Sequence, residues 1–266
     1  MEIELITREP KDKTDAKSTP LMFIHGAWHA AWCWDEYFLP YFAEKGYTSY
    51  ALSFRGHGKS TPLTTNQLRL TRIKHYVEDL TQVVAKLPAP PVLIGHSMGG
   101  LVTQKYLENH EAPAAILLGS VPAHGAIFAT LRTMMREPLA FLKTNLALRL
   151  YPVIGTEENA RMILFSETMP SEKVRDYQNR LQDESYLGYM GMILLELPRT
   201  SKIKTPMLVL AGDKDAIFSV WEERRTAHTY HADFVVLPET PHDAILESNW
   251  QSTADIILRW LDERGL

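Results

Sequence analysis

Short apolar runs bounded by turn residues alternate along the chain with longer stretches whose apolar residues recur at the period of a helix. The short runs are typical of buried strands, and the longer pattern is typical of helices with one apolar face. The predicted strands are residues 20–25, 48–54, 91–95, 115–119, 206–211 and 232–237. The predicted helices are about 32–45, 72–87, 98–109 and 250–263. Strand and helix are therefore expected to alternate.

This alternation predicts the α/β class, with a mostly parallel central sheet that is flanked by helices on both faces. Ligands of such sheets bind beyond the carboxyl ends of the strands, so the residues that directly follow each strand are the first candidates for function. Residues 3–7 are expected to add an antiparallel edge strand, joined to the sheet by the polar, turn-prone residues 11–18. The turn-rich residues 56–66 are expected to form a surface loop.

The alternation stops between residues 122 and 199, where the pattern is helical and the sequence is rich in Met, Leu and Phe. The strand predicted at 206–211 restores it. Because the length of the chain permits one large domain with a small insertion, we expect two parts. Residues 1–121 and 200–266 would form an α/β core, and residues 122–199 would form a helical cap inserted into it.

Composition and charge narrow the class of protein. With 266 residues, of which 45% are hydrophobic and 23% charged, the chain has the composition of a globular protein. Its formal charge of −4 gives no basic field, so no nucleic-acid partner is expected. No apolar run approaches the roughly 20 residues of a membrane span, and no apolar leader follows Met1, so a cytoplasmic location is expected. The single cysteine, Cys33, predicts neither an internal disulfide nor a zinc site.

The strongest chemical signal is the sequence Gly-His-Ser-Met-Gly at residues 95–99, which matches the G-x-S-x-G pattern. It lies between a predicted strand and a predicted helix, which is the position that a nucleophile elbow requires. The flanking glycines leave room for a sharp turn that projects the hydroxyl of Ser97 above the sheet. We therefore expect Ser97 to be a catalytic nucleophile.

A serine hydroxyl needs a histidine base, and the histidine needs an acidic group that orients it. Two later strand ends offer these groups. Asp213 and Asp215 follow the strand at 206–211, and His242 and Asp243 follow the strand at 232–237. The order Ser, Asp, His is the one expected for the nucleophile-elbow architecture. Asp243 is expected to order its loop and to point away from the site.

The whole chain resembles the α/β-hydrolase superfamily, in particular its cap-bearing serine esterases, including carboxylesterases and methylesterases. The loop at residues 25–34, which reads HGAWHAAWCW, carries this resemblance together with the elbow and the strand-end acid and base. In similar proteins the acid lies in a G-x-x-D pattern, which favours Asp215 over Asp213. The resemblance also favours Ala27 as an oxyanion-hole donor over the adjacent Trp28.

The second oxyanion donor is expected to be the backbone N–H of Met98, the residue after the nucleophile. Other histidines receive structural interpretations. His25 is expected to shape the loop after its strand, and His96 is expected to orient the elbow. The remaining histidines that we assign to solvated surface or loop positions are His57, His75, His110, His228 and His231.

Trp28, Met134, Met162 and Met190 are candidates for the lining of a substrate pocket. Methionines are common core filler and tryptophans are common packing anchors, so a purely structural role is the alternative for each of them.

These residues predict a serine carboxylic ester hydrolase that forms an acyl-enzyme on small to medium esters with a hydrophobic acyl or aryl part. No metal or organic cofactor is expected. A thioesterase, lactonase, carbon–carbon bond hydrolase or cofactor-free perhydrolase could use the same residues. Serine in place of aspartate disfavours epoxide hydrolases and dehalogenases, and Ala27 in place of threonine disfavours hydroxynitrile lyases. A non-catalytic small-molecule receptor is the alternative of another class.

Overall fold

The computed structural model describes residues 1–12, 14 and 16–266, and a seven-stranded sheet organises this part of the chain. The strands lie in the order β1-β3-β2-β4-β5-β6-β7, and only β1 is antiparallel to its neighbour among these described strands. Their bounds are β1 (Leu5–Arg8), β2 (Leu21–Ile24), β3 (Ser49–Leu52), β4 (Val92–His96), β5 (Ala115–Leu118), β6 (Met207–Gly212) and β7 (Asp233–Leu237). The predicted mostly parallel sheet with an antiparallel edge strand is confirmed.

The central strands are buried along their whole length. Every residue of β2, β4 and β5 is buried, which explains why these strands read as uninterrupted apolar runs. On one face, Phe23 packs its ring 5.0 Å from that of Trp34, with Phe38 and Phe42 around it. Burying each such side chain contributes roughly 1.5–3 kcal/mol, so the strands form a rigid frame for the loops at their ends.

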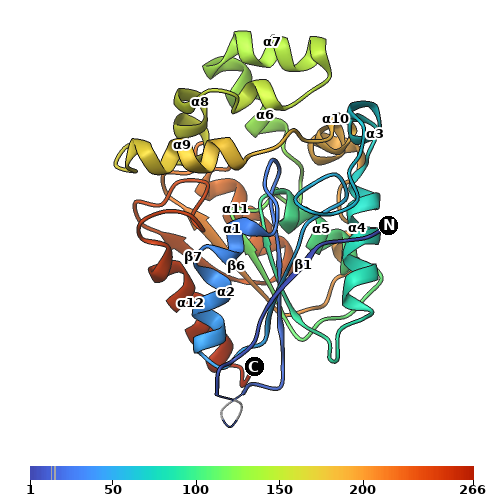
Figure 1. The fold of residues 1–266 in the computed structure, drawn as a ribbon, viewed down its shortest axis with the longest axis vertical. Helices are drawn as coiled ribbons and strands as arrows, with labels where there is room; N and C mark the ends of the chain where they lie inside the picture. The colour runs from blue at the N-terminus through green and yellow to red at the C-terminus, as the bar shows by residue number, and fades with distance from the viewer. Residues whose placement is uncertain (13, 15) are drawn as a thin grey trace.

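Helices flank this sheet, as predicted (Figure 1). Figure 1 shows α2 beside α12 and α4 beside α5, and these pairs are in contact. The helices outside the β5–β6 connection are α1 (Trp32–Asp35), α2 (Phe38–Glu44), α3 (Thr65–Arg69), α4 (Ile73–Val84), α5 (Met98–Tyr106), α11 (Val220–Tyr230) and α12 (Trp250–Asp262).

The structure corrects two details of this part of the prediction. Residues 32–45 form two helices instead of one. In a single continuous helix the ring of Pro40 would clash with the carbonyl of Glu36, and Pro40 has no N–H to donate to that carbonyl. Residues 56–66 precede and enter a short helix, α3, which begins with a capping box between Thr64 and Gln67. Of the predicted connection at residues 11–18, Lys13 and Asp15 lie outside the described residues.

Between β5 and β6 the chain is helical, as its sequence pattern indicates. We call residues 122–199 the inserted segment. Figure 1 shows its helices α6 to α9 stacked above the sheet. Its elements, with the short turn that follows it, are α6 (Ile127–Arg136), α7 (Pro138–Ala147), η1 (Tyr151–Val153), α8 (Glu157–Leu164), α9 (Ser171–Arg180), α10 (Tyr186–Met190), the π-helical η2 (Gly191–Leu195) and η3 (Thr200–Lys202).

Local chemistry explains where several of these helices begin. Pro138 occupies the first turn of α7, where its missing N–H costs nothing. The hydroxyls of Thr156 and Ser185 accept hydrogen bonds from the N–H groups of Asn159 and Gly188 and so cap α8 and α10. None of the helices in the described part of the chain is both long and apolar enough to cross a bilayer.

Candidate active site

Ser97 lies at the turn between β4 and α5 in a backbone conformation that is rare for a residue with a side chain, with φ of 52°. Close backbone packing enforces this turn. A Cβ atom on Gly99 would lie 2.3 Å from the carbonyl oxygen of Ile24, and one on Gly95 would lie 2.6 Å from the carbonyl oxygen of Gly99. Only glycine fits at these two positions, so the turn requires the two glycines of the G-x-S-x-G motif.

The structure brings Ser97, His242 and Asp215 together from the ends of three strands. Ser97 Oγ lies 3.0 Å from His242 Nε2, and His242 Nδ1 lies 2.8 Å from Asp215 Oδ2. The other carboxylate oxygen of Asp215 accepts hydrogen bonds from the backbone N–H groups of Ile217 and Phe218, at 2.7 and 2.9 Å. The carboxylate is therefore fixed, and its free edge orients the imidazole.

Burial separates the two acidic residues that the sequence offered after β6. The side chains of Asp215 and His242 are 2% and 1% exposed, whereas Asp213 is exposed. This geometry places Asp215, and not Asp213, in contact with the histidine.

The loop that follows β2 packs directly against the serine. A Cβ atom on Gly26 would lie 2.9 Å from Cβ of Ser97, so the backbone of Ala27 must pass close to the hydroxyl. Ala27 and Ser97 line the same pocket, and Met98 begins α5 with a fully buried side chain. Among the described residues, the N–H groups of Ala27 and Met98 have no backbone acceptor. Both donors are therefore available to a bound oxyanion.

Trp28 adopts a left-handed conformation with φ of 66°, which is strained for a bulky side chain. Its neighbours over-determine this geometry. The carbonyl of Trp28 accepts a hydrogen bond from the N–H of Gln182 at 2.8 Å, and the carbonyl of Ala27 lies 2.8 Å from His29 Nδ1. The loop that carries Ala27 is thus held from both sides.

His29 and Asp243 form a buried pair that sequence reasoning missed. His29 Nε2 lies 3.0 Å from Asp243 Oδ2, and both side chains are almost fully buried. Both ring nitrogens face acceptors, so both donate only when the imidazole is protonated. Burial lowers the pKa of His29, but Asp243 outweighs burial and leaves it raised. Burial likewise raises the pKa of Asp243, and His29 outweighs it and leaves it lowered.

This pair connects the two sides of the site. Asp243 directly follows His242, and His29 donates to the carbonyl of Ala27. The carboxylate of Asp243 contacts His29, whereas the ring of His242 is held by Asp215, in keeping with the expectation that Asp243 orders its loop. The sequence gives little sign of this pair, because His29 and Asp243 lie 214 positions apart.

Two further histidines are fully buried beside the site and stay neutral. His96 Nε2 donates to the carbonyl of His242 at 2.9 Å, and burial together with the charge of His242 lowers the pKa of His96 to about 4. His25 accepts from the N–H of Phe54 at 3.0 Å and donates to the carbonyl of Gly26 at 2.8 Å. Burial lowers its pKa well below the ordinary value. Both rings therefore hold the backbone of the neighbouring loops in place through hydrogen bonds.

The expectation that His57 is solvated is wrong. His57 is fully buried, and its Nε2 lies 3.3 Å from Oε2 of Glu184, a residue of the inserted segment. The other oxygen of Glu184 accepts from Tyr76 Oη at 2.5 Å and from the N–H of Ser185 at 2.6 Å. Burial lowers the pKa of His57, but Glu184 outweighs burial and leaves it raised. The inserted segment supplies this cover, which the local sequence around His57 does not indicate.

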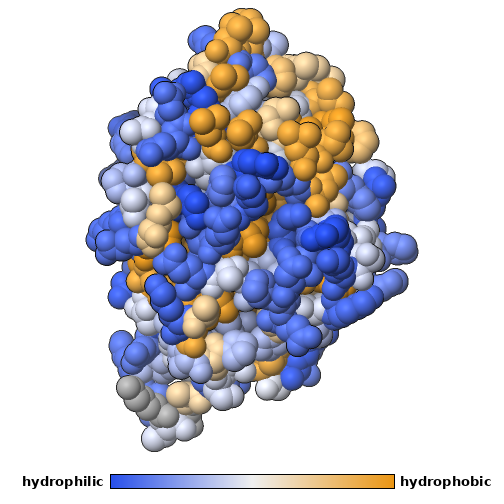
Figure 2. Space-filling model, turned by 90° about the vertical axis from the view of Figure 1, so that its right-hand side faces the viewer, coloured by the Kyte–Doolittle hydropathy of each residue, from blue (hydrophilic) through white to orange (hydrophobic). Residues whose placement is uncertain are grey.

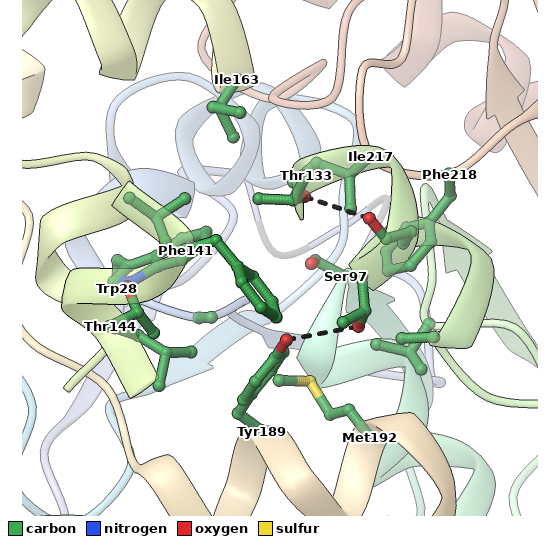
Figure 3. Close-up of a pocket in the computed structure, with 17 residues that line it drawn as sticks. Trp28, Ser97, Thr133, Phe141, Thr144, Ile163, Tyr189, Met192, Ile217 and Phe218 are labelled. Carbon is green, nitrogen blue, oxygen red and sulfur yellow. Dashed lines mark hydrogen bonds between the residues drawn. The ribbon is translucent and has the colours of Figure 1, made fainter. Parts of the chain in front are cut away.

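An apolar pocket extends from Ser97 under the inserted segment (Figure 3). Figure 3 shows the side chains of Phe141, Tyr189 and Met192 around Ser97. Tyr189 Oη lies 3.4 Å from Thr130 Oγ1, so these two hydroxyls of the pocket wall form a hydrogen bond with each other. The lining consists of Ala27, Trp28, Ser97, Val121, Ala126, Ala129, Thr130, Thr133, Phe141, Thr144, Leu150, Val153, Ile163, Tyr189, Met192, Ile217 and Phe218.

Of the four candidates for the pocket lining, the structure places only Trp28 there. Met134 is 39% exposed, because α6 turns Ala129, Thr130 and Thr133 towards the pocket and Met134 away from it. Met190 lies outside the lining and Met192, two positions further along the helical turn, takes that place. Met162 lines a separate surface groove with Arg161 and Glu167. Expecting these three methionines in the pocket was therefore wrong.

No group of three His, Cys, Asp or Glu side chains in the described ranges is arranged to hold a metal ion. Cys33 is buried, and burial raises its pKa well above the ordinary value, so it is no competing nucleophile.

Comparisons with known proteins agree with this architecture. Residues 21–256 match the alpha/beta hydrolase family. A non-heme chloroperoxidase from Burkholderia pyrrocinia is 34% identical over 42% of this chain and 41% of that protein, so the chain spans less than half the length of that relative. Methylesterase 2 from Arabidopsis thaliana is 23% identical over 83% of this chain and 88% of that protein.

Among solved structures, a monoacylglycerol lipase from Paleococcus ferrophilus shares the fold, with a TM-score of 0.74 at 18% identity over 99% of this chain and 100% of that one. A likeness at this level of identity concerns the fold alone. The family match covers most of the chain, including the elbow, the strand-end acid and the histidine loop. The chain therefore belongs to the alpha/beta hydrolase family.

Proposed function

We propose that the protein is a serine carboxylic ester hydrolase, with Ser97 as nucleophile, His242 as general base and Asp215 as the acid that orients it. The observation that carries this proposal is the hydrogen-bonded chain from Ser97 Oγ through the His242 ring to Asp215, with contacts of 3.0 and 2.8 Å. These contacts have the geometry that a serine needs in order to lose its proton as it attacks a carbonyl carbon.

In the first half-reaction, Ser97 Oγ bonds to the ester carbonyl carbon and its proton passes to His242 Nε2. The N–H groups of Ala27 and Met98 stabilise the oxyanion, a contribution of about 3–4 kcal/mol for each donor. The carbon–oxygen bond to the alcohol then breaks, and the alcohol takes the proton from His242. In the second half-reaction, a water molecule gives a proton to His242 and displaces the acyl group, and that proton returns to Ser97.

The pocket supports a substrate of small to medium size with a hydrophobic acyl or aryl part. Its wall is built from aliphatic and aromatic side chains, including Val121, Phe141 and Ile163, and the few hydroxyls in it come from threonines, Tyr189 and Ser97 itself. The similarity to a methylesterase is in keeping with an ester substrate.

We further propose that the inserted segment is a cap, because its helices supply most of the pocket wall. We also propose that the protein acts in the cytoplasm, where its single cysteine would stay reduced.

Perhydrolysis is a second candidate, because the chain is similar to a chloroperoxidase that is described as non-heme. Hydrogen peroxide would then replace water in the second half-reaction and yield a peracid. The same acyl-enzyme serves both reactions, so the two candidates differ only in the nucleophile that releases the acyl group.

Hydrolysis of p-nitrophenyl esters of increasing acyl length tests the proposal. We expect kcat/KM to rise with acyl length until the pocket is filled and to fall about 10⁵-fold or more in Ser97→Ala. Ser252→Ala, which removes an exposed hydroxyl on α12, is the matched control and should keep wild-type activity. Equal turnover by Ser97→Ala and the wild type would contradict the proposal, and a rate that requires added peroxide would favour perhydrolysis.

A further inference from the structure

The outer faces of α6 and α7 carry large apolar side chains that nothing in the described part of the chain covers. On α6 these are Ile127, Phe128, Leu131, Met134 and Met135, and on α7 they are Leu139, Leu142 and Leu146. Met135, Leu139 and Leu146 are more than two-thirds exposed, at 71%, 70% and 78%. Figure 2 shows hydrophobic residues gathered over the upper end of the molecule, where Figure 1 places α6 and α7. We call this surface the outer face.

Both helices lie between the pocket and the outer face. Their inner sides line the pocket through Ala129 and Thr133 of α6 and through Phe141 and Thr144 of α7. A helix at the surface of a protein in water normally turns its second side to solvent with polar residues. Contiguous exposed apolar side chains of this extent mark a surface that contacts a partner or a membrane.

The outer face continues to an aromatic pair at its edge. Trp221 at the start of α11 is 58% exposed, and its ring lies 6.1 Å from that of Phe128, edge to face. The guanidinium of the exposed Arg225 lies 5.7 Å from the centre of the Trp221 ring. Tryptophan and phenylalanine beside a cation form a combination that favours the boundary between lipid headgroups and acyl chains.

The charges around the outer face are mainly basic. Residues 127–149 contain four basic residues and one acidic residue, although the whole chain carries −4. Arg132 and Arg149 pair with Glu222 and Asp183. Arg136 and Lys143 are exposed, and Arg136 donates only to a neutral acceptor among its described contacts, the carbonyl of Ala216. Together with Arg225 they outnumber Glu137, the one acidic residue of this stretch, and place a net positive charge beside the apolar side chains.

We propose that the outer face docks peripherally on an anionic lipid surface, with the leucines of α7 and Trp221 entering the headgroup region and the basic residues facing lipid phosphates. A second copy of this chain fits less well, because a symmetric contact through the outer face would place the same basic residues against each other. The docking does not depend on the proposed function. If that function also holds, hydrophobic esters in the lipid would reach the pocket from the surface that its own helices touch.

Co-sedimentation with vesicles tests this docking, and the Ser97→Ala variant serves as the test protein so that no hydrolysis alters the lipid. One vesicle is phosphatidylcholine alone and the other is an equal mixture of phosphatidylcholine and phosphatidylglycerol. We expect binding to the mixed vesicles and much weaker binding to the neutral ones. Adding Leu142→Gln and Leu146→Gln should lower the partition coefficient about tenfold or more, and adding Lys143→Gln should lower it about fivefold on mixed vesicles only.

Leu5→Gln is the matched control, because it removes an exposed leucine from the edge strand β1 and should leave vesicle binding unchanged. With Ser97 intact, the Leu142→Gln and Leu146→Gln protein should hydrolyse a soluble butyrate ester at the wild-type rate, which shows that it is folded. If neither the wild type nor any variant hydrolyses the ester, that result contradicts the proposed function and leaves the docking proposal to be decided by vesicle binding.

Absence of binding to the mixed vesicles would overturn the proposal, as would binding that the two leucine substitutions leave unchanged. Light scattering measures the oligomeric state and so tests the alternative that the outer face contacts a second copy. A dimer in solution that Leu142→Gln and Leu146→Gln dissociate, in a protein that ignores vesicles, would assign the outer face to a second copy and would also overturn the proposal.

Discussion

The loops at the strand ends and the helices of the inserted segment meet at Ser97, but they are built in opposite ways. In the loops, the polar side chains next to Ser97 are held by specific partners, as His242 is by Asp215 and His29 is by Asp243. In the inserted segment, apolar side chains such as Phe141 and Met192 face the pocket, and others such as Leu139 and Leu146 face the exterior. Directional bonds fix the reacting groups, whereas non-directional packing shapes the pocket.

The two regions therefore control different properties of the protein. Moving one hydrogen-bonded group in the loops should damage the rate of reaction, because orientation is lost. Changing one apolar side chain in the inserted segment should change which ester fits, because volume is gained or lost without a change in the reacting geometry.

The largest effect should follow from Asp215→Asn. An amide in place of the carboxylate favours the wrong imidazole tautomer, and we expect kcat for a soluble ester to fall about 10⁴-fold. Asp213→Asn is the matched control, because Asp213 is exposed and should stay within about twofold of the wild type. Steady-state kinetics of both proteins measures the contrast, and similar losses in the two variants would disprove the assignment of the acid.

A smaller effect should follow when His29→Leu and Asp243→Asn are combined, which removes the buried pair without leaving an unpaired charge. Ala27 then loses the donor on its carbonyl and its N–H is less well aimed, so we expect kcat to fall about tenfold to a hundredfold. KM for a short ester should change little, because the pocket wall is intact. An unchanged kcat in a folded double variant would show that the pair does not position the loop.

The same pair should make stability depend on pH. His29 has a raised pKa, so its contribution is complete below the unfolded value of about 6.5 and is lost as pH rises through the raised folded value. Asp243 has a lowered pKa, so its contribution is present above about 4 and is lost as pH falls through the lowered value. Urea unfolding should therefore show the largest difference in the free energy of unfolding between wild type and double variant at mildly acid pH. A difference that is constant from pH 5 to pH 9, or one that grows with pH over about that range, would contradict the charged pair.

The smallest effect concerns the pocket. Phe141→Ala enlarges the cavity next to Ser97, and we expect the ratio of kcat/KM for an octanoate ester to that for a butyrate ester to rise about fivefold. Met134→Ala is the control, since Met134 lies on the outer side of α6 and should leave this ratio unchanged. If Met134→Ala shifts the ratio as much as Phe141→Ala does, α6 does not turn Met134 away from the pocket.

The sequence predicts the sheet and the strand-end residues because both depend on local patterns. Buried parallel strands must be apolar throughout, and the turn at Ser97 admits only glycine at Gly95 and Gly99. Such requirements leave a trace in a few adjacent residues. The break in the helix at Pro40 was also local, and reading that proline as a helix breaker would have placed it.

The pocket and the buried pairs are harder to predict because they depend on distant segments. His57 is covered by Glu184, and His29 meets Asp243, across 127 and 214 positions of the chain. The choice of Met192 over Met190 depends on the phase of an irregular, π-helical turn. Neither long-range contact nor helix phase leaves a signature in composition.

Covalent labelling of Ser97 tests the central claim most directly. A fluorophosphonate should modify the folded wild-type protein, and mass spectrometry of its peptides should place the adduct on Ser97. Labelling should disappear in Ser97→Ala, fall strongly in Asp215→Asn and persist in Ser252→Ala. A folded wild-type protein that is not labelled at Ser97, or labelling that Ser97→Ala leaves unchanged, would contradict the account.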